Sequence, residues 1–135
     1  MPRLARRASL PAAAAAALWL VAGTAVATRT VDVNSKVSIH SASLHFTGKV
    51  TVPEAFEPCR EDRKVVLFKV VSGGPDQAVG RDTTNGQGAW SITPSGSAGI
   101  SLAHFYAKAK QRSDGTAGTI FVCHATRSKT IKPTP

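Results

Sequence analysis

The strongest constraint on the fold is an alternation of apolar and polar side chains in the C-terminal third of the sequence. The alternating residues are Ala103, His104, Phe105, Tyr106, Ala107, Lys108, Ala109 and Lys110. Because successive side chains of a β-strand point to opposite faces, this period of two predicts a strand with one buried face. A similar alternation from Val37 to Val50 predicts a second half-buried strand.

Turn residues separate further predicted strands. Residues 63–71 (RKVVLFKVV) are apolar on both parities, which predicts a central strand covered on both sides. A Gly/Pro turn over 72–76 leads to a short strand over 77–81, and residues 119–125 form the next strand after a turn over 111–118. About seven short strands without helical periodicity predict an all-β fold, an antiparallel β-sandwich with one domain over 28–135.

The N-terminus has the three parts of a secretory signal. Arg3, Arg6 and Arg7 precede an uncharged run over 12–23, and small residues occupy 25–27. The run is shorter than the ~20 residues that span a bilayer. We therefore expect residues 1–27 to be removed on export and the mature chain to begin at Thr28. The ends of that chain, 28–35 and 132–135, are predicted to be flexible.

Two cysteines, Cys59 and Cys123, are the only ones in the sequence. Export places them in a compartment where disulfides persist, so we expect them to be joined to each other. The predicted disulfide links the acidic, proline-containing loop over 53–62 to a strand near the C-terminus. Such a link stabilises the fold by roughly 4 kcal/mol in the chain-entropy treatment.

Residues 84–90 read TNGQGAW and resemble the T-[D/N]-x-x-G-x-aromatic motif of carboxypeptidase-regulatory-like domains, which have a transthyretin-like, carbohydrate-binding-like β-sandwich. Residues 46–50, 59–67 and 105–107, with Cys123, are similar to exported versions of that domain from high-GC bacteria. The likeness covers most of 44–127 and implies architecture more than function. The residues to which it assigns the turn and the core anchor are Thr84, Asn85, Gly86, Gly88 and Trp90.

The Asn85-Gly86 step also favours the positive φ of a tight turn from its residue types alone. Trp90 and Ile92 then share one face of the following strand. We therefore expect Trp90 to anchor the core, with the alternative of a carbohydrate-stacking role.

No catalytic pattern is recognised in the sequence. No G-x-S-x-G motif surrounds the candidate nucleophiles Ser41, Ser43, Ser72 and Ser95. His40 and His45 would point to opposite faces of one strand, and no local pair of histidines or cysteines supplies two metal ligands. The carboxylates of 53–62 lie on one loop without an aromatic platform. We expect neither enzyme activity nor a metal or other cofactor, with a small hydrolase as a remote alternative.

A basic surface is the candidate binding site. His104, Tyr106, Lys108 and Lys110 share the polar face of their strand, Arg112 follows, and Arg127, Lys129 and Lys132 lie on or after the expected partner strand. Without residues 1–27 the chain keeps 14 of 17 Lys and Arg and all eight Asp and Glu, a net charge of +6. These cations could attract an anionic cell-wall polymer, a polysaccharide or phospholipid headgroups. Alternatively, they form a solvated face that prevents aggregation of strand edges.

These features predict a secreted, non-enzymatic β-sandwich module that binds an anionic polymer, a carbohydrate or a protein partner at the cell envelope. A secreted protein inhibitor is the alternative, presenting the loop over 72–77 or that over 94–99 to an exported protease. Nucleic acid is not an expected partner, because the mature chain has only one Tyr and one Trp for stacking. The oligomeric state is left open.

Overall fold

A computed structural model describes residues 23, 27–95 and 102–134. Nearly all of the predicted signal (1–27) and most of the loop over 94–99 therefore lie outside the described residues. Within the described part of the chain, no helix is long and apolar enough to cross a membrane.

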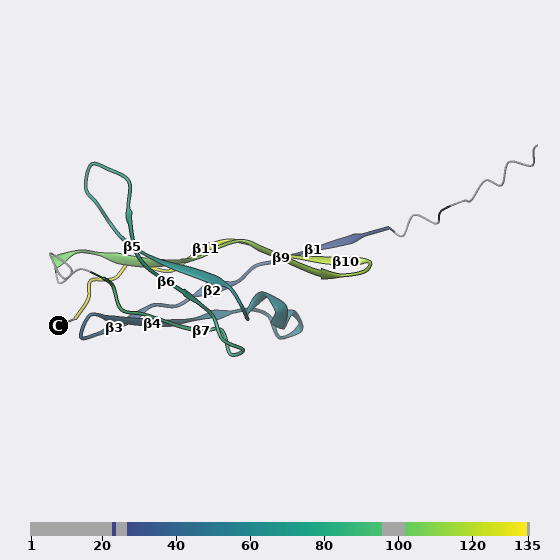
Figure 1. Cartoon of the computed structure of the whole chain (residues 1–135), viewed down its shortest axis with the longest axis horizontal. Coiled ribbons are helices and arrows are strands. Elements are labelled where there is room, and N and C mark those ends of the chain that lie inside the picture. Colours follow the sequence, from purple (N-terminus) through teal and green to yellow (C-terminus); the bar gives the residue numbers. More distant parts are fainter. Residues whose placement is uncertain (1–22, 24–26, 96–101, 135) are drawn as a thin grey trace, which may run out of the picture.

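Two four-stranded sheets face each other and form a β-sandwich (Figure 1). The first sheet is antiparallel, and its order is β11 (Thr126–Arg127), β8 (Phe105–Ala109), β5 (Lys64–Lys69) and β6 (Gln77–Thr83). In the second sheet β4 (His45–Thr51) pairs with β2 (Lys36–Val37), β3 (His40–Ala42) and β7 (Ala89–Ile92). The predicted all-β sandwich is confirmed, and β5 lies inside its sheet as expected.

The core fills the space between the two sheets. Phe105, Ala107 and Ala109 of β8 are buried, as the alternation predicted, and the Phe105 ring lies 4.9 Å from that of Phe46. Trp90 is 2% exposed and belongs to the same core. The prediction that Trp90 anchors the core is therefore confirmed.

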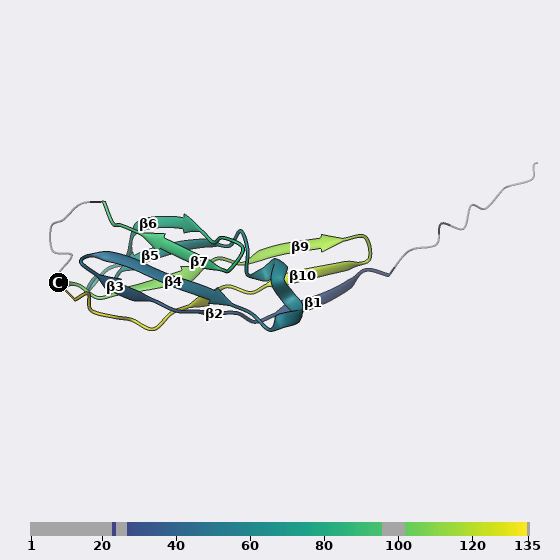
Figure 2. The same cartoon turned by 90° about the horizontal axis from the view of Figure 1, so that it is seen from below.

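A third sheet extends from one end of the sandwich (Figures 1 and 2). Its order is β1 (Arg29–Val33), β10 (Thr119–Cys123) and β9 (Arg112–Thr116), with β1 parallel to β10. Most of the segment over 28–35, for which flexibility was predicted, forms β1, whose backbone pairs with β10 and whose Val33 packs beside the disulfide. Arg112–Thr116, predicted to be part of a turn, is a strand for a similar reason, since it pairs with β10.

The described part of the segment over 132–135, for which flexibility was also predicted, contacts the second sheet. Pro133 is buried. The Thr134 backbone N–H donates to Ser41 Oγ at 3.3 Å, and the Thr134 hydroxyl donates to the Ser41 carbonyl at 3.2 Å. The C-terminal segment is therefore docked on β3.

The described residues contain eleven strands instead of about seven, because long alternating segments are interrupted. The alternation from Val37 to Val50 reverses at Ser43 and Leu44, whose φ angles are 48° and 62°. Two successive positive φ angles are typical of a type I′ hairpin turn, which usually contains Asn-Gly. Ser-Leu carries no such signal, so the sequence predicted a single strand where the structure has two, β3 and β4. The loop over 53–62 contains the 3-10 segment η1 (Glu54–Cys59).

In the turn before β7, the glycine with a positive φ angle is not the one that was predicted. The positive φ, 78°, belongs to Gly88, and Gly86 is not among the residues with positive φ. Asn85 Oδ1 accepts from the backbone N–H groups of Gln87 and Ala89, both at 3.0 Å. The Asn85 side chain therefore organises the turn, and a Cβ on Gly88 would meet the Val50 carbonyl.

Candidate functional site

Five cationic side chains stand on the outer face of the first sheet, the side away from the core. We call this surface the cationic face; its members are Lys64, Arg81, Lys108, Lys110 and Arg127. Strand parity determines its composition, because Val65 and Leu67 of β5 point into the core while Lys64 and Val66 point outward. All five are exposed.

Strand register places three of these cations in one row. Arg127 lies directly opposite Lys108, and Val66 lies between Lys108 on one side and Arg81 on the other. Lys64 and Lys110 form a second row beside it, since the Lys110 N–H donates to the Lys64 carbonyl at 2.9 Å. The two rows therefore cross the strands rather than follow them.

Two hollows open on this face. The larger, about 630 Å³, is lined by the cations Lys64, Arg81 and Lys110 together with Val65, Val66, Asp82 and Thr83. The smaller, about 260 Å³, lies between Lys108 and Lys110. Val66 is only 3% exposed although it is on the outer face, which we attribute to the aliphatic stems of the surrounding Lys and Arg side chains.

The cations of this face form no ion pair with a described carboxylate. Ion pairs among the described residues involve Arg60, Arg112 and His124, and none involves the cationic face. Like charges directly opposite each other destabilise a sheet. Arg127 opposite Lys108 is such a pair. Neither cation forms an ion pair with a described carboxylate, although Asp76, which is hydrogen-bonded to Tyr106, lies near enough to interact with the charge of Arg127.

An aromatic stack borders the cationic face. The Tyr106 ring lies 5.3 Å from the nearly parallel ring of Phe68, and the Arg127 guanidinium carbon lies 3.5 Å from the Tyr106 centroid. The Tyr106 hydroxyl donates to Asp76 Oδ2 at 2.8 Å, and the Val71 N–H donates to Asp76 Oδ1 at 3.2 Å. Asp76 thus fastens the β5–β6 loop to the sheet.

These contacts shift two pKa values in opposite directions. The hydrogen bond from Tyr106, followed by that from the Val71 N–H, lowers the pKa of the Asp76 carboxyl. Burial and the bond to Asp76 raise the pKa of the Tyr106 phenol. Tyr106 is only 7% exposed, so its ring supports Arg127 instead of offering a free binding surface.

The five residues predicted from sequence do not all lie on the cationic face, although Arg112 lines a hollow of about 540 Å³ beside it together with Lys64 and Lys110. Lys108 and Lys110 lie on the cationic face, and Tyr106 lies below Arg127. His104 precedes β8, where its carbonyl accepts from the Val70 N–H. Arg112 lies on β9 and contacts the Glu61 carbonyl at 2.6 Å and Asp114 at 3.3 Å.

Arg112 is separated from Lys108 because the chain continues from β8 in the first sheet into β9 in the third sheet without reversing its direction (Figure 2). Sequence reasoning missed Lys64 and Arg81. The outward parity of Lys64 relative to the core residues Val65 and Leu67 was a usable signal, whereas nothing local placed Arg81 beside β5 in register.

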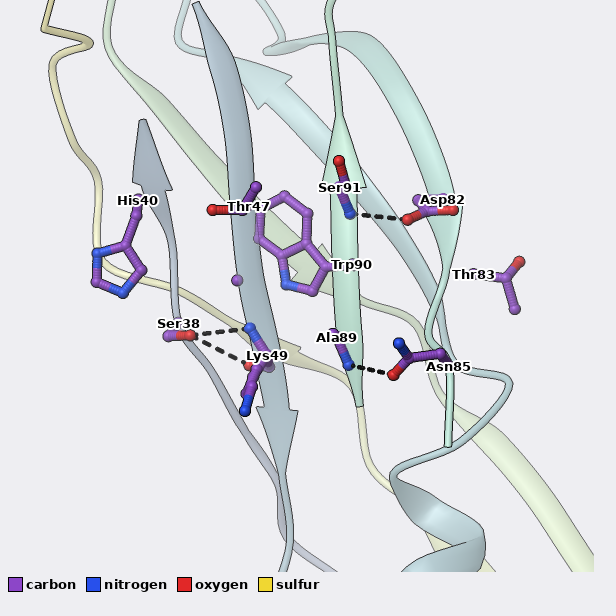
Figure 3. A pocket seen from close by; sticks show the side chains of 11 residues that line it. Ser38, His40, Thr47, Lys49, Asp82, Thr83, Asn85, Ala89, Trp90 and Ser91 are labelled. Atoms are coloured by element: carbon purple, nitrogen blue, oxygen red, sulfur yellow. Dashed lines mark hydrogen bonds between the residues drawn. The ribbon is translucent and has the colours of Figure 1, made fainter. Parts of the chain in front are cut away.

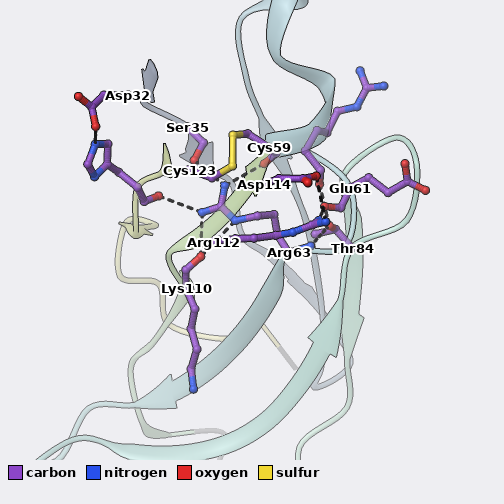
Figure 4. The surroundings of a disulfide bond; sticks show 12 residues. Asp32, Ser35, Cys59, Glu61, Arg63, Thr84, Lys110, Arg112, Asp114 and Cys123 are labelled. Atoms are coloured by element: carbon purple, nitrogen blue, oxygen red, sulfur yellow. Dashed lines mark hydrogen bonds and ion pairs between the residues drawn. A yellow bond between two sulfur atoms is a disulfide. The ribbon is translucent and has the colours of Figure 1, made fainter. Parts of the chain in front are cut away.

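A buried arginine joins the sandwich to the third sheet near the disulfide (Figure 4). The predicted Cys59–Cys123 disulfide is confirmed. Arg63, which is 0% exposed, donates five hydrogen bonds beside it: two to the Lys110 carbonyl and one each to the His124 carbonyl, the Cys59 carbonyl and Ser35 Oγ. Burial, with a smaller effect of Arg112, lowers the pKa of the Arg63 guanidinium.

The turn motif over 84–90 also contacts Arg63, through Thr84. Thr84 Oγ1 accepts from the Arg63 N–H at 2.8 Å and donates to the Arg60 carbonyl at 2.7 Å. Arg60 Nε in turn donates to the Gly86 carbonyl at 2.9 Å. Thr84 and Gly86 therefore help to hold the segment Arg60 to Arg63 beside the disulfide. The role of Arg63 was not predicted, since the sequence placed it only at the start of a strand.

A further hollow of about 590 Å³ lies on the second sheet where β7 adjoins the edge strand β6 (Figure 3). Ser38, His40, Thr47, Asp82 and Asn85 contribute polar groups to it, and the buried Trp90 forms part of its wall. Trp90 Nε1 is buried and has no hydrogen-bond partner among the described residues. The hollow thus has mixed polar chemistry without a dominant charge.

A histidine beside this hollow bridges two hydroxyls. His45 Nδ1 lies 2.7 Å from Thr93 Oγ1, and His45 Nε2 lies 2.9 Å from Ser91 Oγ. A serine nucleophile commonly uses its own backbone N–H in the oxyanion hole, but the Ser91 N–H donates to Asp82 Oδ2 at 2.7 Å. We interpret the arrangement as a cross-strand ladder of polar side chains.

The histidines are dispersed over the described part of the chain. No group of three or more His, Cys, Asp or Glu side chains suited to a metal ion occurs among the described residues. His40 and His45, expected on one strand, lie on β3 and β4 on either side of the hairpin turn. His124 contacts Asp32 at 2.9 Å, away from both.

Comparisons with known proteins give no match. No known protein family matches the chain. The curated proteins and the solved structures likewise contain no match. The resemblance to carboxypeptidase-regulatory-like domains therefore stays a prediction, and the cationic face is the feature from which a function is argued.

Proposed function

We propose that this protein is a secreted, non-enzymatic β-sandwich module that binds an anionic polymer of the cell envelope through the cationic face. The observation that carries the proposal is the pair formed by Arg127 and Lys108, two cations held directly opposite each other without an ion pair to a described carboxylate. A bound anion would relieve the repulsion within this pair.

Protection of sheet edges explains only part of the charge pattern. Arg127 and Arg81 lie on the edge strands β11 and β6, where a charge discourages pairing with another chain. Lys64 and Lys108 lie on the interior strands β5 and β8, whose edges are already paired. Their position supports recognition of an anion rather than edge protection.

Partition of the protein between culture medium and cell envelope tests the proposal. The variant Lys108→Gln/Lys110→Gln removes two cations from the face. Each cation near an anionic surface contributes about 1 kcal/mol, so we expect the loss of two cations to lower envelope association at low salt by roughly tenfold to thirtyfold. Association of the wild type should decline as salt increases, and the variant should show a shallower salt dependence.

A matched control removes the same charge elsewhere. Lys36 and Lys49 are exposed on the second sheet, so Lys36→Gln/Lys49→Gln has the same net charge as the test variant. We expect this control to partition like the wild type. Equal partitioning of all three proteins at low salt would show that the cationic face is only a solvated surface.

Export is a separate part of the proposal. The disulfide is typical of proteins that fold in an oxidising compartment. We expect N-terminal sequencing of the secreted protein to begin at Thr28. Retention of residues 12–23 in the secreted material would contradict the proposed cleavage.

The inhibitor alternative gains support from one contact. Asp76 ties the predicted inhibitory loop over 72–77 to Tyr106 and Val71, and a protease inhibitor needs such a rigid loop. Inhibition of exported proteases that is lost on Asp76→Asn, and unaffected by Lys108→Gln/Lys110→Gln, would favour this alternative over polymer binding.

A further inference from the structure

The cationic face has a geometry that suits one class of anionic polymer better than others. We propose that its ligand is a linear polymer with phosphodiester groups in its backbone, lying across the strands along the row Arg127, Lys108 and Arg81. This inference rests on the proposed function and names the chemistry of the polymer.

The direction of the row gives the first argument. Neighbouring strands are about 4.8 Å apart, so a row from β11 through β8 and β5 to β6 spans roughly 14 Å. Arg127 and Lys108 occupy its first two strands, and Arg81 occupies the last. One small anion cannot reach both ends of such a row, whereas an extended chain with repeated charges can.

The opposed pair at the start of the row gives the second argument. Side chains directly opposite each other in an antiparallel pair have Cβ atoms about 5 Å apart. Arg127 and Lys108 can therefore approach one anion from two directions. The two non-bridging oxygens of a phosphodiester share its negative charge, so Arg127 and Lys108 can each bind one of them, whereas a carboxylate commonly pairs both of its oxygens with a single guanidinium.

Arg127 is held in place before any ligand arrives. One face of its guanidinium lies on the Tyr106 ring, and Nη2 donates to Thr130 Oγ1 at 3.1 Å. An arginine stacked on an aromatic ring loses less side-chain freedom when its N–H groups bind phosphate. Arg127 is therefore the anchor of the row.

The surroundings disfavour two other ligand classes. Carbohydrate recognition commonly uses a free aromatic ring, but Tyr106 is covered by Arg127 on the cationic face. A flat lipid surface would first meet the β5–β6 loop, which rises from the first sheet on the side away from the second (Figure 1). A thin polymer can lie beside this loop and reach the floor of the face at Val66.

Binding of defined polyanions to the mature protein, with its disulfide intact, tests this inference. The probes are linear inorganic polyphosphate, poly-L-glutamate with a matched number of charges, and phosphatidylglycerol vesicles. We expect polyphosphate to bind at least tenfold more tightly than polyglutamate at the same salt concentration. The triple variant Arg81→Gln/Lys108→Gln/Arg127→Gln should reduce the slope of log affinity against log salt by two to three.

Two further variants test the geometry. Arg127→Lys keeps the charge but loses the planar stack, so we expect at least a threefold loss of polyphosphate affinity with an almost unchanged salt slope. In double-mutant cycles, Arg127→Gln and Lys108→Gln should be non-additive because they share a phosphate. Arg127→Gln and Lys64→Gln lie on different rows and should be additive. Melting temperatures verify that each variant is folded.

The outcomes separate the two proposals. Equal binding of polyphosphate and polyglutamate, or additive effects of Arg127→Gln and Lys108→Gln, would overturn the phosphodiester assignment while the anionic-polymer function remains. Binding to vesicles but not to polyphosphate would overturn it in favour of a lipid surface. Binding to none of the three probes, together with unchanged envelope partitioning of Lys108→Gln/Lys110→Gln, would overturn both proposals.

Discussion

Replacement of Arg63 by methionine is the most demanding stability test of this structure, because the side chain is buried and makes five hydrogen bonds without a carboxylate partner. The substitution leaves four acceptors without their donor: the carbonyls of Lys110, His124 and Cys59 and the hydroxyl of Ser35. Each buried unsatisfied group costs about 1–3 kcal/mol, so four such groups set an upper range of roughly 4–12 kcal/mol. The loss is smaller than this range because the bonds to the Lys110 and His124 carbonyls are only part-buried.

Removal of the buried charge offsets part of this loss. Transfer of an ion from water to a protein interior costs several kcal/mol even after relaxation, and the methionine variant avoids that cost. We therefore expect Arg63→Met to lower the free energy of unfolding by about 3–5 kcal/mol. That is a large part of the 5–15 kcal/mol typical of a domain.

Urea denaturation followed by tryptophan fluorescence measures the effect, since Trp90 is the only tryptophan after position 27. With a slope of about 2 kcal/mol/M, the midpoint should fall by roughly 1.5–2.5 M. Arg63→Lys keeps the charge with three donors in place of five and should lie between wild type and Arg63→Met. The control Arg81→Met, at an exposed position, should stay within about 0.5 kcal/mol of wild type. A midpoint for Arg63→Met within about 0.3 M of wild type, with an unchanged slope, would refute the assigned role of Arg63.

Three further outcomes are expected. Reduction of the disulfide, whose cysteines are 64 positions apart, should lower the free energy of unfolding by about 4 kcal/mol, and a loss below about 1 kcal/mol in urea denaturation would contradict this. Tyr106, the only tyrosine, should titrate above its ordinary pKa of about 10 in ultraviolet absorbance, and Asp76→Asn should move that pKa downward. Because folding raises this pKa, the associated stability is present below pH ~10 and is lost as pH rises through the folded pKa. Gly88→Ala should cost at least about 2 kcal/mol because of its positive φ and the clash with the Val50 carbonyl, whereas Gly86→Ala should cost less.

Local sequence patterns were sufficient for part of this structure. The alternation around Phe105 and Ala107 correctly assigned the inward and outward sides of β8, because in a strand the direction of a side chain depends only on its parity. Two cysteines allow a single pairing, and the disulfide was predicted for that reason. The burial of Trp90 followed from its position on one face with Ile92.

The pairing of distant segments could not be read from the same patterns. Residues 29–33 looked like a flexible leader because their partner, β10, is almost the whole chain away. The turn at Ser43 and Leu44 lacks the usual Asn-Gly residues, so its positive φ angles are imposed by the pairing of β3 with β4. In both places the stabilising contacts come from outside the segment whose conformation they determine.

The candidate site shows the same division between local and tertiary information. The sequence by itself determined that Lys108 and Lys110 point away from the core, because parity is a property of one strand. Only the tertiary structure decided that Arg81 and Arg127 share their face and that Arg112 does not. Strand order and register bring residues from four separate segments into two rows, and they are set by backbone pairing and core packing across the whole domain rather than by the charged residues themselves.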